Sequence, residues 1–169
     1  MGFMVVERFA KEWGIPLRGA ICRARVGEGL CDGEPVRVAL PQTSMNLSGE
    51  SVQGLRERWR AETLDLLVVC DDVSLPLGNI RLRGQGSDGG HRGLASILEA
   101  VGSKAVPRLR VGIASETMGE DLIGFVLDPF KKSEEKTLEK ALIQAVEACE
   151  VWMHRGLSAA MNLFNTRKK

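Results

Sequence analysis

The sequence predicts an α/β protein, and three observations lead to this class. Short apolar runs typical of strands alternate with segments whose apolar residues recur at helical spacing. The 169 residues, 44% of them hydrophobic, are enough to bury one core, so a single domain over residues 1–169 is expected. Nineteen glycines and 5% aromatic residues favour a loop-rich α/β protein over a helical bundle.

Helices are expected where apolar residues at helical spacing are separated by charged ones. The segments with this pattern are residues 1–13, 51–60, 94–101 and 134–155. Gly14 and Pro16 end the first of them. Ser133 is the expected N-cap of the last, and Glu134 and Glu135 in its first turn complement the helix dipole.

Strands are expected over short apolar or alternating segments. These are residues 18–26, 36–40, 66–70, 79–83, 109–113 and 125–127. The turn-rich segment 27–35 between the first two predicts a hairpin. The uninterrupted apolar run 66–70 predicts a strand buried on both faces, and Asp71 and Asp72 then follow its carboxyl end, where open α/β sheets place their sites. As an isolated pair, however, the two aspartates fit a turn better than an acid/base site.

The loop 84–93 is the most informative segment for function, because it holds five glycines and one of the two histidines of the chain. Such glycines indicate positive φ angles or close approach, and His91 beside them indicates a polar site. The spacing Gly-x-Gly-x-x-Gly from Gly84 matches a dinucleotide pattern, but Arg108 and Arg110 stand where the ribose carboxylate is needed. A flexible loop is therefore favoured over a cofactor site, and His154 is expected on a helix surface.

Composition narrows the possible partners. The net charge of +1 means that nucleic-acid binding would need a local basic face, for which solvated surface charge is an equally good interpretation. The candidate cations are Arg81, Arg83, Arg92, Lys104, Arg108, Arg110, Lys131 and Lys132. The four cysteines form no CxxC pair or zinc-like spacing, and neither a signal peptide nor a membrane-spanning run is recognisable. We expect a soluble, cytoplasmic protein with free thiols, in which Cys70 is inert.

Several uncommon sequence blocks, in order along the chain, resemble those of bacterial-type peptidyl-tRNA hydrolases. The blocks are Pro41–Gly49 (PQTSMNLSG), Val69–Asp72 (VCDD), Leu75–Gly78 (LPLG), Gly89–Leu94 (GGHRGL) and Pro107–Ile113 (PRLRVGI). The resemblance implies a three-layer α/β/α domain around a mixed, twisted sheet. It also implies hydrolysis of the ester that joins a peptide to tRNA, without metal or cofactor and with tRNA as partner.

Residue by residue, the resemblance implies roles for the matching positions. Asp71 matches an aspartate that orients a general-base histidine, and Asn46 and His91 match residues that position substrate and water. The positions matching Arg83 and Arg110 imply a clamp on the tRNA 5′ phosphate. Ser44 and Arg92 stand at two further substrate-contact positions, where the family has an aromatic residue and an asparagine.

The chain also departs from the family pattern at its start. Family members begin with a strand, a Gly-Asn-Pro-Gly turn and a Thr-Arg-His-Asn segment, whereas this sequence begins at Met1-Gly2-Phe3. We therefore expect the central strand and the general-base histidine to be missing, and a monomer if that strand is restored. Three hypotheses remain: a peptidyl-tRNA hydrolase, a catalytically impaired RNA-binding protein derived from one, and an unrelated nucleotide-binding α/β protein.

Overall fold

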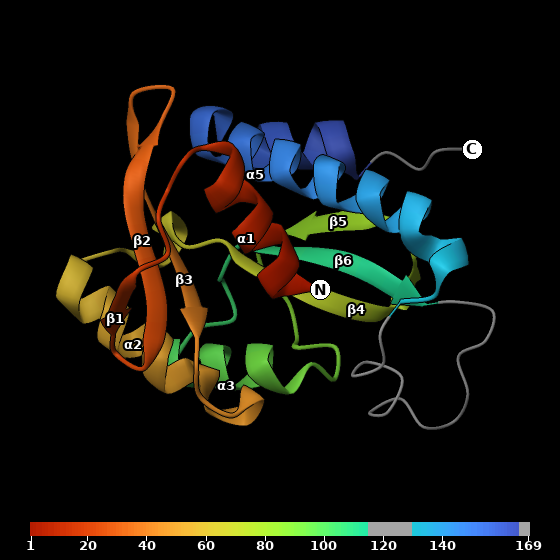
Figure 1. Cartoon of the computed structure of the whole chain (residues 1–169). Helices are drawn as coiled ribbons and strands as arrows, with labels where there is room; N and C mark the ends of the chain where they lie inside the picture. Colours follow the sequence, from red (N-terminus) through yellow and green to blue (C-terminus); the bar gives the residue numbers. More distant parts are fainter. Residues whose placement is uncertain (115–129, 166–169) are drawn as a thin grey trace.

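The computed structural model describes residues 1–114 and 130–165. Its helices are α1 (Gly2–Glu12), α2 (Ser48–Trp59), α3 (Arg92–Val101) and α5 (Glu135–Phe164), with 3₁₀ turns η1 (Met45–Leu47), η2 (Thr63–Asp65) and η3 (Lys132–Glu134). Its strands are β1 (Gly19–Ile21), β2 (Ala24–Cys31), β3 (Glu34–Pro41), β4 (Val68–Pro76), β5 (Ile80–Arg83) and β6 (Arg108–Ala114). Helices α1 and α5 lie on one side of the strands and α2 and α3 on the other (Figure 1).

Within the described residues, the strands form two three-stranded sheets. The first is antiparallel, in the order β1-β2-β3. The second has the order β4-β6-β5 and is mixed, because β4 runs parallel to β6 and β5 antiparallel to it. The expected α/β class with helices around a mixed sheet is confirmed. The strands β3 and β4 stand at the edges of their respective sheets.

The two faces of the second sheet differ in polarity. Leu82, Leu109 and Val111 are fully buried in the cluster that includes the apolar face of α5. Because side chains alternate along a strand, the residues between them point to the opposite face. Those residues are Arg81 and Arg83 on β5, in register with Arg110 and Arg108 on β6. Four arginines therefore share the sheet face that points away from α5.

The expected hairpin is present, but its turn is shorter than predicted. The single strand expected over residues 18–26 is wrong, because Cys22 and Arg23, both with positive φ, make a turn that divides it into β1 and the start of β2. Strand β2 continues to Cys31, and Asp32 and Gly33, both with positive φ, make the turn. The glycines that suggested a longer turn lie within the strand, where a Cβ at Gly27 would come within 2.8 Å of Ile15. Close packing of Ile15, rather than a turn, accounts for this glycine.

The prediction of a both-face-buried strand over residues 66–70 is wrong in two respects. Strand β4 begins at Val68 and extends to Pro76, so Asp71 and Asp72 lie inside it, because parallel pairing with β6 continues through Asp72 and Gly112. Val68 and Val69 are only half-buried, since β4 stands at the edge of its sheet among residues 1–114 and 130–165.

The last helix begins later and ends later than expected. Ser133 lies within η3 and does not cap α5, which runs to Phe164 across a break at Gly156 (φ 78°, ψ 170°). Beyond it, the Asn165 side chain accepts a hydrogen bond from Leu82 N (2.8 Å) and donates one to Leu82 O (2.9 Å), which satisfies part of the edge of β5. The strand expected over residues 125–127 falls outside the described residues.

Candidate active site

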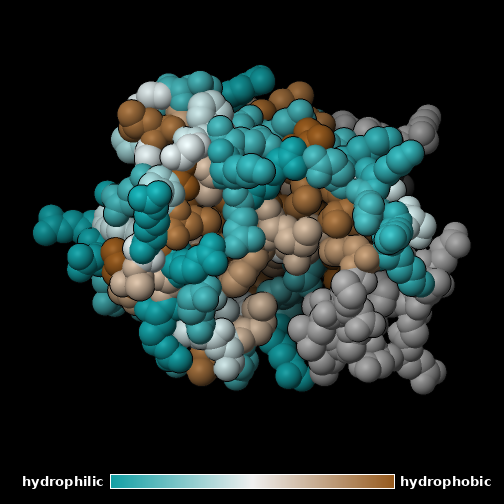
Figure 2. Space-filling model, viewed as in Figure 1, coloured by the Kyte–Doolittle hydropathy of each residue, from teal (hydrophilic) through white to brown (hydrophobic). Residues whose placement is uncertain are grey.

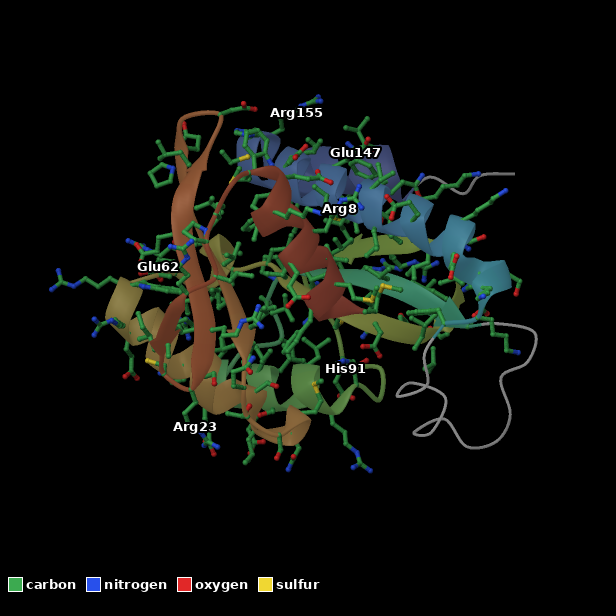
Figure 3. All side chains as sticks on the ribbon, in the orientation of Figure 1. Arg8, Arg23, Glu62, His91, Glu147 and Arg155 are labelled. Atoms are coloured by element: carbon green, nitrogen blue, oxygen red, sulfur yellow. The ribbon has the colours of Figure 1, made fainter. Side chains whose placement is uncertain are left out.

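Asp71 and His91 face each other across 3.5 Å, measured from Asp71 Oδ1 to His91 Nε2. Their side chains are 15% and 17% exposed, respectively. Asp71 comes from β4, and His91 stands at the end of the glycine loop as the N-cap of α3 (Figure 3). The structure thus brings together a carboxylate and an imidazole from two of the sequence blocks that carry the family resemblance.

A backbone contact orients the His91 ring. Its Nδ1 accepts a hydrogen bond of 2.9 Å from Leu94 N–H, as an N-cap side chain does. In the neutral ring the proton therefore resides on Nε2, and this N–H faces Asp71. Both ring nitrogens are engaged, one as acceptor and the other toward the carboxylate.

Charge keeps Asp71 ionised. Burial raises its pKa, but the hydrogen bond and the charge interaction with His91 oppose burial, and the pKa is lowered below the ordinary 3.8. The neighbouring Cys70 thiol has its pKa raised to about 12, chiefly by burial. A thiol with this pKa is not a nucleophile near neutral pH, so the prediction of an inert Cys70 is confirmed.

Asp71 and His91 lie on the wall of a cavity of about 490 Å³ between β3 and β4. The rest of its wall is mainly apolar and includes Val38 of β3, Val69 of β4, Trp59 of α2 and Trp152 of α5. In the middle of the face shown in Figure 2, apolar residues reach the surface between hydrophilic flanks. An extended apolar chamber therefore borders the polar pair.

Three predicted substrate contacts lie around this pair without bonding to it. Ser44 is exposed at the N-cap of η1, Asn46 is exposed within η1, and Arg92 is exposed in the first turn of α3. The two segments touch, because the Met45 sulfur packs so closely against Gly93 that a Cβ there would lie 2.5 Å away. Among the hydrogen bonds of the described residues, none joins Asn46 to Asp71 or His91.

The two arginines matched to a phosphate clamp differ in their surroundings. Arg83 is exposed on β5. Arg110 donates from Nη1 to Asp72 Oδ2 (3.0 Å) and from Nη2 to the carbonyl oxygens of Ser87 (3.1 Å) and Asp88 (2.9 Å). The sequence interpretation missed this aspartate–arginine link. The alternation of β6, which puts Arg110 on the loop side of the sheet, was the available signal.

Neither a metal centre nor a membrane span is found in residues 1–114 and 130–165. No group of three or more histidine, cysteine, aspartate or glutamate side chains there is arranged to hold a metal ion. No helix in the same residues is long and apolar enough to cross a membrane. All four cysteines are free.

Comparison with known proteins decides the family. The model of the family described as "Peptidyl-tRNA hydrolase" matches residues 1–169. The chain belongs to the peptidyl-tRNA hydrolase family. It is 46% identical over 165 residues to the peptidyl-tRNA hydrolase of Synechococcus sp. (strain JA-2-3B'a(2-13)), covering 97% of this chain and 74% of that relative. It is 38% identical over 167 residues to the peptidyl-tRNA hydrolase of Bacillus subtilis (strain 168), covering 99% and 89%.

Solved structures of the peptidyl-tRNA hydrolase family share the fold. The crystal structure of peptidyl-tRNA hydrolase from Acinetobacter baumannii superposes with a TM-score of 0.90 at 30% identity, covering 98% of this chain and 85% of that one. A peptidyl-tRNA hydrolase in complex with N-propanol also gives a TM-score of 0.90, at 31% identity and with coverage of 99% and 85%. The predicted family, fold class and hydrolase function are confirmed.

Proposed function

We propose that this chain hydrolyses the ester bond between peptide and tRNA, with Asp71 and His91 as the groups that touch the reacting atoms. The observation that carries this assignment is the contact between the two side chains on the cavity wall. Membership of the peptidyl-tRNA hydrolase family supplies the reaction class. The contact identifies the two side chains of this chain that meet on the wall of the cavity, where an ester would enter.

Asp71 and His91 have different chemical roles in this proposal. Asp71 stays ionised near neutral pH, because its pKa is lowered, and it orients the imidazole. His91 Nε2–H, held toward Asp71, is a donor that an ester carbonyl oxygen bound beside the pair can accept from. Water attack also requires a proton acceptor, and Asp71 is the ionised acceptor on this cavity wall.

The exposed polar residues near the pair are proposed to contact the substrate. Ser44, Asn46 and Arg92 lie near the N-terminus of α3, where the 3′ end of tRNA and its peptide would approach. Arg83, exposed on the arginine-bearing face of the sheet, is the proposed phosphate contact. We further propose that the protein acts in the cytoplasm and needs no metal.

A second candidate function is tRNA binding with impaired hydrolysis, and one observation favours it. The Nδ1 lone pair of His91 is occupied by Leu94 N–H, so the neutral ring has no free lone pair to take a proton from water. The lowered pKa of Asp71 makes its carboxylate a weak base. General-base assistance is typically worth about 10² to 10⁴ in rate, so hydrolysis by this pair would be correspondingly slow.

Single-turnover hydrolysis of an N-acetylated aminoacyl-tRNA by the whole chain tests the proposal. The His91→Gln variant should cleave at least roughly tenfold more slowly than the unchanged chain. His154→Gln is the matched control, because the other histidine is exposed on α5, beside Cys31 and Asp32. Tight tRNA binding without cleavage would select the second candidate, and equal cleavage by both variants would contradict the assigned pair.

A further inference from the structure

The neighbouring carboxylates Asp71 and Asp72 point to different surroundings, because successive side chains of β4 alternate. Asp72 is buried, with 7% exposure. Its Oδ1 accepts hydrogen bonds from Ser74 N–H (2.8 Å) and Ser74 Oγ (2.6 Å), and its Oδ2 accepts one from Arg110 Nη1. Both carboxylate oxygens of Asp72 are thus engaged, Oδ1 by Ser74 and Oδ2 by Arg110.

Arg110 in turn holds the backbone of the glycine loop. Its second terminal nitrogen donates to two consecutive carbonyl oxygens, those of Ser87 and Asp88. The guanidinium also lies directly against Gly89, where a Cβ would come within 2.5 Å of Nη1 and φ is +62°. Only glycine accommodates both the close approach and the backbone conformation at this position.

One of the two carbonyl groups that Arg110 contacts, that of Asp88, is hydrogen-bonded to the backbone of His91. Asp88 O accepts a hydrogen bond from His91 N–H (3.3 Å), and Asp88 Oδ1 accepts one from Gly90 N–H (2.7 Å). The imidazole then returns to Asp71 on the same strand. Two neighbouring residues of β4 therefore act on the same loop. Asp72 holds the loop through Arg110, and Asp71 faces His91, which the loop carries.

We infer that Asp72 and Arg110 are positioning residues that hold the glycine loop so that His91 faces Asp71. This role rests on the proposed function of the Asp71–His91 pair. Arg110 is only 16% exposed and directs its terminal nitrogens at protein oxygens. Of the two arginines that the resemblance matches to a phosphate clamp, Arg83 is the exposed one.

The test measures positioning without relying on catalysis. Asp72→Asn removes the negative charge that Arg110 contacts and so weakens this interaction. Asp32→Asn, at an exposed turn, is the matched control. Carboxyl NMR should show the pKa of Asp71 rising toward 3.8 in Asp72→Asn as His91 moves away, with no rise in the control. Exchange of the Leu94 amide, which His91 caps, should quicken by at least roughly tenfold.

A second variant keeps the test decisive if Asp72→Asn fails to fold. Arg110→Lys retains a positive charge opposite Asp72 but lacks the fork that reaches the two carbonyls, so it should shift the Asp71 pKa and Leu94 exchange in the same directions.

Folded variants with an unchanged Asp71 pKa and unchanged Leu94 exchange would overturn the positioning role. Failure of the unchanged chain to cleave its substrate would instead count against the proposed function, and the NMR comparison would still decide the role of Asp72 and Arg110.

Discussion

The two sides of β4 differ in how completely their groups are partnered. On the side of β6 and the glycine loop, Asp72 and Arg110 bond to each other, to Ser74 and to two loop carbonyls. On the side of β3, the edges of two sheets border an apolar cavity of about 490 Å³. Asp71 stands where the two regions meet. The comparison indicates that the first region fixes the position of His91, while the second leaves space beside it.

The largest effect on stability should come from the polar side. Arg110→Ala removes the cation from a buried carboxylate and releases two loop carbonyls, so it should lower the free energy of unfolding by about 3 kcal/mol. Urea unfolding measures this change. A loss as small as that of Arg83→Ala, an exposed arginine on the same sheet face, would break the comparison.

A matched pair of valines tests the packing difference directly. Val111 on β6 is completely buried, whereas Val69 on β4 is half-buried and lines the cavity. Val111→Ala should cost about 2 kcal/mol of unfolding free energy, and Val69→Ala less than about 1 kcal/mol, because fewer contacts are lost beside an existing cavity. Equal costs would mean that the cavity is closed in solution.

Salt dependence sharpens the contrast between the two arginines. If about three phosphates are neutralised, the logarithm of tRNA affinity should fall with the logarithm of salt concentration at a slope of roughly −2 to −3. Arg83→Ala should make this slope shallower by about one unit, and Arg110→Ala should leave it unchanged. Titrations at several salt concentrations check this, and a shallower slope for Arg110→Ala would place that side chain on phosphate.

The smallest effect concerns pH. Burial raises the pKa of Asp72, but the hydrogen bonds from Ser74 and the hydrogen bond and charge of Arg110 outweigh it, so the pKa is lowered from 3.8. A lowered folded-state pKa stabilises the fold above the ordinary value, and this stabilisation is lost as pH falls through the folded pKa. Asp72→Asn should therefore be less stable than the unchanged chain at pH 7, with the gap closing below about pH 4. A gap that widens in acid would reverse the assignment.

Local patterns predicted the elements better than their pairing. The spacing of Val5 and Phe9 identified α1, and alternation around Leu82 and Leu109 identified β5 and β6. The apolar run ending at Cys70 could not reveal that β4 is an edge strand, because neighbouring strands are set by contacts distant in sequence.

The candidate site was predicted in identity and only partly in geometry. The glycine loop and the residues after the apolar run pointed to His91 and Asp71, which the structure brings into contact. The partners of Asp72 could not be foreseen, because its bond to Arg110 joins residues 38 positions apart. The state of the His91 ring depends on a backbone N–H that no side-chain pattern encodes.

The most direct test of the central claim is a double-mutant cycle on the Asp71–His91 pair. Single-turnover hydrolysis would be measured for the unchanged chain, Asp71→Asn, His91→Gln and the double variant. If the two side chains act as one unit, the double variant should be no more than roughly threefold slower than the slower single variant. Rate losses that multiply in the double variant would show that the two residues act independently, and would contradict the account.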